Sequence, residues 1–379
     1  MSQAAGRLHI AVVGLRFGGS FPPIYAAHPD VAQVTICDSD EPTLHAYGDK
    51  YGLARRTTRV EDILAARDVD AVHLVTPIPS HAALSLAVLD AGKHCACTVP
   101  MATTLDDLHA IIAAQRRSRR NYMMMETAAY TYHCLYTEEL IRRGELGRIQ
   151  FLRGAHYQDM ENWPDYWMGL PPMHYATHAL APLLKLARTR ATRVHCFGSG
   201  VMRSELRPRY GNPYPVETAI YRLADGDLAA EVTRTLFHTA VQYAEIYSVY
   251  GENATFNWVL ENELPLLFRM APLQPGRGRP ITTERVAPPS FREHLPEPLR
   301  RFDGHRIIPD PKNPHQSILQ GGGHHGSHPH LCHEFVRSIV EQRRPAIDAV
   351  TAADWTAAGI CAHQSAMQGG AAVDVPAFA

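Results

Sequence analysis

Short apolar runs alternate with longer helix-like stretches over the first third of the chain. Five runs have the length of buried β-strands and end at glycine, proline or polar residues. They are residues 8–13, 34–37, 71–75, 94–97 and 122–125. The stretches between them that predict helices are residues 42–51, 60–66, 81–91 and 105–119, with Ser80 and Gly92 as cap candidates for the third. Strands alternating with helices predict right-handed crossovers and a parallel sheet.

The pattern changes after about residue 147. Runs at 216–223 and 228–236 flank Asp225-Gly226, a strong hairpin signal, and runs at 244–250 and 255–260 flank a second turn. These runs predict an antiparallel meander. Proline and glycine are dense from 265 to 326, which predicts mostly loop. Helical patterns return at 335–341 and 352–367, so the second part is a domain built on an antiparallel sheet.

Length and charge narrow the class of protein. A chain of 379 residues predicts two domains. Lys and Arg total 37 and Asp and Glu total 38, a balance that argues against a nucleic-acid partner. No apolar run approaches the roughly 18 residues of a membrane helix, and the polar start does not resemble a secretory signal. We therefore expect a soluble, cytoplasmic protein with no membrane partner.

Cysteines and histidines offer two candidate metal patterns, and we favour neither. The seven cysteines are scattered without a CxxC pair, which predicts buried free thiols. Five histidines and Cys332 fall between His324 and His333, but their spacing fits no standard zinc site. A loop that reaches a substrate pocket and leads into a helix is the preferred interpretation, with no metal.

The turn after the first strand has the features of a dinucleotide site. Gly14 and Gly19 match the first and third glycines of GxGxxG, while Arg16 occupies the second glycine position and is able to pair with phosphate oxygens. Asp38 ends the second strand, where an acid hydrogen-bonds a ribose hydroxyl and repels a 2′-phosphate. The strand–turn–helix context favours NAD over a phosphate-free tight turn.

Four short motifs, in order and at fitting spacings, carry a family resemblance. They are Thr76-Pro77-x-x-x-His81, Ala91-Gly92-Lys93-His94, Val99-Pro100-Met101-Ala102 and Gly144-Glu145-Leu146-Gly147. Together they resemble the Gfo/Idh/MocA oxidoreductases. The resemblance implies an α/β fold in which residues 1–126 form an NAD-binding Rossmann domain. Residues 127–379 would form a substrate-binding and oligomerisation domain with an open, mainly antiparallel sheet, its C-terminal helices packing back on the first.

The resemblance also implies a cofactor site and a partner. The expected NAD-binding residues are Gly14, Arg16, Phe17, Gly19, Asp38, Thr76, Pro77, His81, Val99, Pro100, Glu126 and Thr127. The expected substrate is a small carbohydrate or cyclitol, and the open sheet implies a homodimer or homotetramer. Two positions depart from the family. Val99 stands where the dehydrogenases usually carry a proton-transferring Lys, and His174 replaces an Asp.

A narrower resemblance concerns the NAD-dependent α-N-acetylgalactosaminidases of the same superfamily. It rests on Met123-Met124-Met125-Glu126, His156-Tyr157-Gln158-Asp159, Tyr175-Ala176-Thr177-His178 and Gly322-Gly323-His324. Those enzymes also lack the Lys, and they oxidise a sugar, eliminate the aglycone, add water and return the hydride. Thr127 and Ala176 replace their Asn and Pro. The shared pattern supports a shared site more than a shared substrate.

Because Val99 cannot transfer a proton, another side chain must take the proton of the substrate hydroxyl. Oxidising a carbinol needs a base, and His178, Tyr175 and His174 are the candidates. His174 and His178 are four apart and would share one face of a helix. Tyr157, Asp159 and His324 are candidate substrate contacts by position and resemblance. The aromatic stretch 163–167 fits either sugar stacking or a subunit interface.

Three functions remain in competition. The first is an NAD-dependent dehydrogenase of a sugar, aminosugar or cyclitol, with a His as proton-transfer residue. The second is a redox-neutral glycosidase that uses NAD as a relay, which accommodates Val99. The third is an NAD-binding regulator without activity, which would need a disabled site. We favour the first over the second because dehydrogenation prevails in the superfamily that the chain resembles. The third is disfavoured because the candidate site residues His178 and Tyr175 are present.

Overall fold

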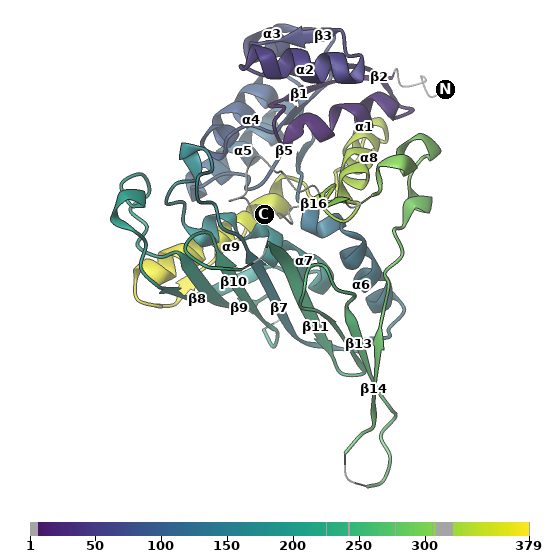
Figure 1. The fold of residues 1–379 in the computed structure, drawn as a ribbon, viewed down its shortest axis with the longest axis vertical. Helices are drawn as coiled ribbons and strands as arrows, with labels where there is room; N and C mark the ends of the chain where they lie inside the picture. Colours follow the sequence, from purple (N-terminus) through teal and green to yellow (C-terminus); the bar gives the residue numbers. More distant parts are fainter. Residues whose placement is uncertain are drawn as a thin grey trace.

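The computed structural model describes residues 7–224, 226–241, 243–276, 278–304, 306–307 and 321–378 of the protein. Asp225 of the predicted turn and the first six residues lie outside the described residues. Figure 1 shows two sheet-containing parts, with the last helices running between them.

The first sheet, sheet A, is parallel and has the order β3-β2-β1-β4-β5-β6. Its strands are β1 (Leu8–Val13), β2 (Val31–Cys37), β3 (Arg55–Thr57), β4 (Ala71–Leu74), β5 (His94–Cys97) and β6 (Tyr122–Met124). This is the strand order typical of dinucleotide-binding folds, whose ligands sit where the order reverses, between β1 and β4. The five predicted strands and the parallel pairing are confirmed, and β3 is an addition.

Helices cover sheet A as the pattern predicts. They are α1 (Pro22–Ala27), α2 (Glu41–Tyr51), α3 (Val60–Ala65), α4 (His81–Asp90) and α5 (Leu105–Ser118). Side chains of Asp40 and Thr104 accept backbone N–H groups at the starts of α2 and α5. Ser80 does not cap α4 in this way, because its hydroxyl points backwards and donates to the Pro77 carbonyl.

The second sheet, sheet B, has the order β14-β13-β12-β11-β7-β10-β9-β8-β17. The strands are β7 (Ile149–Tyr157), β8 (Ala191–Ser199), β9 (Val216–Leu223), β10 (Ala229–Thr235), β11 (Ala244–Gly251), β12 (Ala254–Trp258), β13 (Leu266–Met270), β14 (Ile281–Arg285) and β17 (Val373–Asp374). The predicted hairpins β9–β10 and β11–β12 are confirmed. The simple meander is wrong, because β7 lies between β10 and β11 and pairs parallel to β10.

Among its described residues the stretch from 265 to 326 is mostly loop and short 3-10 turns, as expected, but β13 and β14 within it form a hairpin that projects away from the body of the protein (Figure 1). One further expectation needs correction. The helix expected at 335–341 is α8 (Ser327–Val340), which begins within the histidine-rich run. The other helices are α6 (Tyr132–Arg142), α7 (Thr177–Ala187) and α9 (Ala349–Met367).

Helices α7 and α9 connect the two sheets. A Cβ on Gly154 of β7 would lie 2.3 Å from the Ala179 carbonyl, so α7 packs closely on sheet B. One face of α9 packs against β8 and another against α5 and β6. Helix α8 contacts α1, where Nε2 of His28 lies 2.9 Å from Nδ1 of His333. One continuous apolar core therefore runs through both parts of the chain.

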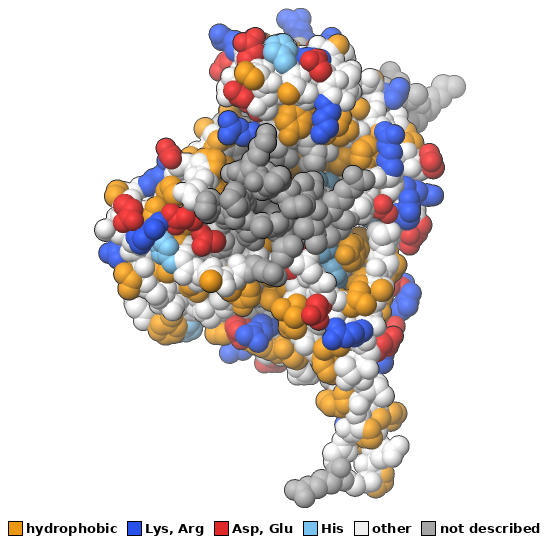
Figure 2. Space-filling view, viewed as in Figure 1, with side chains coloured by type: hydrophobic (Ala, Val, Ile, Leu, Met, Phe, Trp, Pro, Cys, Tyr) orange, Lys and Arg blue, Asp and Glu red, His pale blue; other side chains and the backbone are white. Residues whose placement is uncertain are grey.

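The surface carries both signs of charge. Figure 2 shows Lys and Arg interspersed with Asp and Glu on the face in view, without a large region of one sign. No helix among the described residues is long and apolar enough to cross a membrane.

Candidate active site

The glycine-containing turn lies at the carboxyl end of β1, next to β4. Gly14 has a φ of +91°, and a Cβ there would lie 2.3 Å from the carbonyl oxygen of Val75. The residue must therefore be glycine if the turn is to pack against the end of β4. Asp38 follows β2, and its carboxylate accepts N–H groups from Leu15 at 2.7 Å and Asp40 at 2.9 Å. The acid is thus fixed beside the turn, with lone pairs left for ribose hydroxyls.

The ends of β4 and β5 meet at His81. Its Nδ1 lies 2.7 Å from the Pro100 carbonyl and its Nε2 2.8 Å from the Thr76 carbonyl. Val99 is buried, and the Val99–Pro100 peptide is cis. These residues form the continuation of the β1–β4 edge, where an NAD-binding fold places the cofactor. Phe17 is half exposed, and its ring centroid lies 5.7 Å from that of His324.

Two hydrogen bonds at His178 link the end of sheet A to the turn before α7. Glu126 follows β6 in sheet A, and its Oε1 lies 2.7 Å from Nδ1 of His178 at the start of α7. On the other side of the ring, Nε2 lies 3.1 Å from the Tyr175 hydroxyl. Thr127 contributes its hydroxyl 3.5 Å from Nδ1. The carboxylate of Glu126, which stays a predicted NAD contact, faces His178.

The surroundings of His178 favour its charged form. Burial by itself lowers the pKa of a histidine, but the carboxylates of Glu126 and Glu245 outweigh it and raise the pKa of His178. Burial raises the pKa of the Tyr175 hydroxyl, which therefore stays protonated at neutral pH. His178 and Tyr175 can therefore pass a proton between Nε2 of the imidazole and the phenol oxygen.

A row of four charged or titratable side chains crosses sheet B beneath this pair. Glu245 of β11 is opposite His156 of β7, which is in register with Arg234 of β10, which in turn is opposite Glu217 of β9. We call these four residues the charged row. All four side chains are buried, and each belongs to a different strand. Sequence reasoning missed all four as site residues.

Arg234 holds the charged row to the turn that carries Tyr175. Its guanidinium donates to the backbone carbonyls of Tyr175 and His156, each at 3.0 Å, and to Oε1 of Gln158 at 2.9 Å. It also donates to the carbonyl of Thr235. Burial lowers the pKa of Arg234 to about 10, so it keeps its charge at neutral pH.

Glu245 is the most crowded member of the charged row. The Tyr243 hydroxyl donates to its Oε1. The same oxygen lies 3.5 Å from Nδ1 of His324, 3.7 Å from Nδ1 of His178 and 4.0 Å from Nε2 of His156. Burial would raise the pKa of Glu245, but the three imidazoles outweigh it and lower the pKa well below its usual value. A buried anion therefore lies at the centre of four polar rings.

Some predicted site residues lie elsewhere. His174 belongs to a 3-10 turn (Pro172–Tyr175) that precedes α7, so the expectation that it shares a helix face with His178 is wrong. Its ring instead lies 5.0 Å from that of His363 on α9. Tyr157 follows His156 directly in β7, so its side chain points to the opposite face of the sheet.

The other residues considered as substrate contacts are Asp159, Trp167 in the aromatic stretch 163–167, and His324. Asp159 accepts the backbone N–H of Glu161 at 2.9 Å and is half buried at the end of β7. Trp167 is buried, with its ring centroid 4.8 Å from that of Tyr175. It supports the Tyr175 ring from inside a small apolar cluster. Of these three residues, His324 contacts the charged row, with Nδ1 3.5 Å from Oε1 of Glu245.

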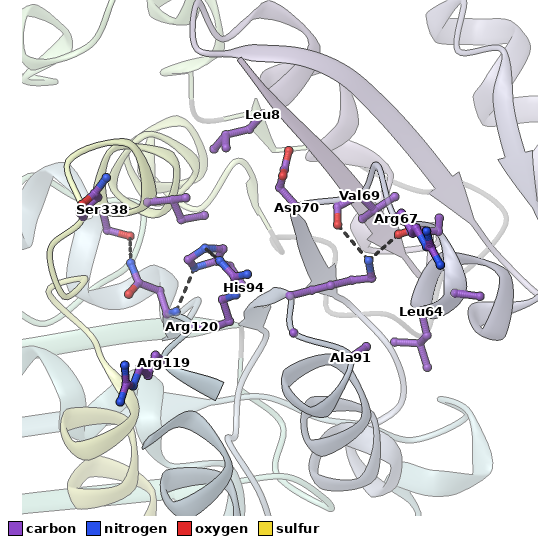
Figure 3. Close-up of a pocket in the computed structure, with 17 residues that line it drawn as sticks. Leu8, Leu64, Arg67, Val69, Asp70, Ala91, His94, Arg119, Arg120 and Ser338 are labelled. Atoms are coloured by element: carbon purple, nitrogen blue, oxygen red, sulfur yellow. Dashed lines mark hydrogen bonds between the residues drawn. The ribbon is translucent and has the colours of Figure 1, made fainter. Parts of the chain in front are cut away.

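A cavity of about 770 Å³ lies at the other end of sheet A (Figure 3). It is lined by residues at the amino ends of the strands, among them Asp70 and His94, and by Ser338 of α8. The Lys93 ammonium on its wall donates to the carbonyls of Ala66 and Val69. Dinucleotides bind at the carboxyl ends of such strands, so this cavity is separate from the His178 site.

The first part of the chain matches a known family. Residues 8–126 match the family model described as "Oxidoreductase family, NAD-binding Rossmann fold", the Gfo/Idh/MocA model. The predicted Rossmann-type fold of this segment and NAD as the cofactor are therefore confirmed. The match covers the segment that holds Gly14, Asp38, His81 and Glu126.

Curated relatives resemble part of the chain. "Glycosyl hydrolase family 109 protein 1" of Bacteroides fragilis is 32% identical over 129 residues, which is 32% of this chain and 28% of the relative. "Glycosyl hydrolase family 109 protein" of Saccharopolyspora erythraea is 24% identical over 292 residues, 66% of this chain and 62% of the relative. The chain thus aligns with less than two thirds of these relatives' length.

Solved structures share the whole fold. "Levoglucosan dehydrogenase, complex with NADH and levoglucosan" has a TM-score of 0.77 and 19% identity, covering 97% of this chain and 99% of that chain. "Aldose-aldose oxidoreductase from Caulobacter crescentus complexed with glycerol" has a TM-score of 0.71 and 19% identity, covering 97% and 99%. At this identity the likeness concerns the arrangement of both sheets.

Proposed function

We propose, on the premise that the chain belongs through residues 8–126 to the Gfo/Idh/MocA oxidoreductase family, that the protein oxidises or reduces a ring carbinol of a sugar, aminosugar or cyclitol. NAD would accept or return the hydride when bound. The residues that would hold it are those of the β1–β4 edge, with Gly14 and Asp38 fixed as a ribose and pyrophosphate site requires.

The observation that carries this proposal is the hydrogen-bonded series Glu126–His178–Tyr175. It runs from the end of sheet A, where the cofactor would lie, to the turn before α7. A carboxylate on Nδ1 fixes the orientation of the ring, as in other acid–base histidines. Nε2 and the Tyr175 hydroxyl are then the two atoms that exchange a proton with the substrate oxygen.

The direction of reaction sets which form of His178 is needed. Oxidation needs a neutral Nε2 to take the hydroxyl proton, directly or through Tyr175. Reduction needs the protonated ring to give that proton back. This assignment makes a lysine at position 99 unnecessary, and the buried Val99 side chain then only packs beside the site.

Relatives named for glycosyl hydrolase family 109 favour a second candidate function. In that reaction NAD would be a retained relay, and a glycoside would be oxidised, cleaved, hydrated and reduced. The same His178–Tyr175 pair would serve both reactions, so the arrangement of residues alone favours neither.

The first experiment separates the two reactions. Purified protein is given free sugars, cyclitols and aryl glycosides with and without added NAD, while NADH absorbance and aglycone release are followed. NADH that accumulates only with added NAD supports the dehydrogenase. Aglycone release without net NADH supports the glycosidase. If no substrate gives either NADH or aglycone release, the proposed function is contradicted.

A variant tests the proton role. His178→Ala should retain NAD binding and lose turnover by about 100-fold or more, the usual contribution of a general acid–base group. Turnover within a few-fold of the parent would show that His178 is not the proton-transfer residue. His178→Asn is a second variant, closer in shape to the parent, for use if His178→Ala disturbs the start of α7.

We also infer the organisation around the site. The boundary between the two domains is placed after Glu126, with α8 and α9 returning to the first domain. The open face of sheet B is proposed to pair with a second copy, giving a homodimer or homotetramer. Size-exclusion chromatography with light scattering tests this directly, and a monomer would contradict it.

A further inference from the structure

Three imidazoles surround one carboxylate oxygen inside the protein. Oε1 of Glu245 lies 3.7 Å from Nδ1 of His178, 4.0 Å from Nε2 of His156 and 3.5 Å from Nδ1 of His324. For His156, His178 and Glu245, one donor atom from each lies within 4.8 Å of the other two. All of these residues are buried. Nitrogen and carboxylate donors thus converge where bulk water does not reach.

His156 is the unusual member of this group. It is 1% exposed, and neither ring nitrogen has a hydrogen-bond partner among the described residues. Oε2 of Glu245 is likewise without a partner within the part of the chain that the structure describes. A buried polar atom left without a partner costs roughly 1–3 kcal/mol, so an imidazole with both nitrogens unpaired indicates a missing ligand.

We propose that His156, His178 and Glu245 bind a divalent transition-metal ion of the Zn²⁺ class. Two imidazoles and one carboxylate are a donor set that such ions favour. Metal–ligand distances of about 2.1 Å place donors roughly 3.4 Å apart at tetrahedral angles, so the donors need only draw together by small side-chain movements. Three protein ligands leave a fourth position for a substrate oxygen or for His324.

The three proposed metal ligands are held in place by regular secondary structure. His156 and Glu245 are fixed opposite each other on β7 and β11, and His178 reaches them from the start of α7. Arg234 holds the backbone of His156 and the turn before α7 together. The three donors therefore stand on rigid elements rather than on mobile loops, which is what a preorganised metal site requires.

The ion would also change the chemistry at His178. Nδ1 cannot carry a proton for Glu126 and a metal ion at once, so binding of the ion displaces that proton. The positive charge of the metal ion would then polarise a substrate oxygen, a role for which the chain has no lysine at position 99. This catalytic role rests on the proposed function, whereas binding of the ion does not.

The histidine-rich run is a different place in the fold. His328 places Nδ1 3.2 Å from the Ser20 hydroxyl, and His333 bonds His28. His330 is buried on the same helix. These side chains pack α8 against the first part of the chain, so only His324, which precedes the helix, reaches Glu245.

The experiment uses the full-length protein, stripped with a chelator and then titrated with Co²⁺ in the absence of NAD and substrate. We expect visible ligand-field absorption that saturates at one Co²⁺ per chain, is displaced by Zn²⁺, and is accompanied by a rise in Tm. Glu245→Gln and His156→Asn should each weaken binding at least about tenfold.

Matched controls locate the ion. Glu217→Gln removes another buried carboxylate of the charged row, and His330→Asn removes a buried imidazole of the histidine-rich run. Both should keep the Co²⁺ spectrum, and circular dichroism of every variant checks folding. No spectrum and no Tm shift in the parent overturn the proposal. So does binding that survives in Glu245→Gln and His156→Asn but fails in His330→Asn. Because neither readout needs turnover, failure of the proposed activity leaves this result intact.

Discussion

His156 of β7 and Glu245 of β11 are directly opposed in the antiparallel register of sheet B, with Nε2 and Oε1 4.0 Å apart. Directly opposed residues project to the same face of a sheet. That face is the one covered by α7, so both side chains enter the interior beside His178. Sheet B is therefore more than a support for the second domain, since it supplies the buried Glu245 and Arg234 to the site.

The first prediction concerns Arg234, which donates four hydrogen bonds and is fully buried. Arg234→Met keeps most of the length of the side chain but leaves the carbonyls of Tyr175 and His156 unpaired. We expect unfolding free energy to fall by about 3 kcal/mol, as when one partner of a buried polar network is removed. Urea denaturation measures it.

Arg153→Met is the control for this change. Arg153 lies on β7 but is largely exposed, and its guanidinium pairs with Glu231 at 3.0 Å. Exposed ion pairs contribute less than about 1 kcal/mol. Equal losses of stability in the two variants would show that the buried network around Arg234 contributes little.

Sheet A was predictable because its central strands β1, β4 and β5 are almost fully buried. These strands are mostly apolar, as in residues 8–13, and each is followed by a helix. Adjacent parallel strands linked by helices leave few alternatives for the topology. The position of Gly14 and Asp38 followed from the same local rules.

The pairing in sheet B was not predictable in the same way. Strand β7 pairs with β10 and β11, which lie far along the chain, and no local signal specifies such partners. A signal for the charged row was nevertheless present. Arg234 continues the alternation of Ala230 and Val232, which are buried, and Glu245 precedes the buried Tyr247 in the same phase. A charge at a buried position of a strand indicates a site.

The second prediction separates the Tyr175 hydroxyl from its ring. Tyr175→Phe retains the packing against Trp167 but removes the oxygen 3.1 Å from Nε2 of His178. We expect kcat to fall by about 100-fold while NAD affinity stays within about twofold, because only the proton path is broken. Steady-state kinetics and NAD titration measure the two effects.

Tyr136→Phe is the matched control, since Tyr136 lies on α6 and packs with Phe256 away from His178. Its kcat should equal that of the parent. A Tyr175→Phe variant with unchanged kcat would remove Tyr175 from the proton path and leave His178 to act on the substrate directly.

The third prediction tests the turn after β1. Gly14→Ala places a Cβ 2.3 Å from the Val75 carbonyl in a left-handed backbone, so the turn must move away from β4. We expect a loss of about 2–4 kcal/mol in stability and a large loss of NAD affinity. Gly52→Ala is the control, because its φ is +65° but nothing lies within 4 Å of the new atom.

Strain alone should cost Gly52→Ala only about 1 kcal/mol, with NAD binding unchanged. The difference between the two variants therefore isolates the contact with Val75 and its effect on the cofactor site. Equal NAD affinities in Gly14→Ala and Gly52→Ala would argue that the cofactor does not depend on this turn.

The fourth prediction concerns the contact between α1 and α8. Burial, and then the neighbouring His333, lower the pKa of His28 from 6.5 to about 4. Between these values the unfolded chain binds a proton that the folded protein excludes, so stability falls as the pH falls from 6.5 to about 4. His28→Gln cannot take up that proton, and its stability should decline less across this window.

Urea midpoints near pH 7 and about pH 5 give the comparison for parent and variant. His45→Gln serves as control, because the His45 side chain is 57% exposed and its replacement should leave the parent's pH dependence unchanged. Since Nε2 of His28 lies 2.9 Å from Nδ1 of His333, protonation of the pair would also separate α1 from α8. A His28→Gln variant with the parent's full pH dependence would place the acid sensitivity in other buried histidines, such as His73.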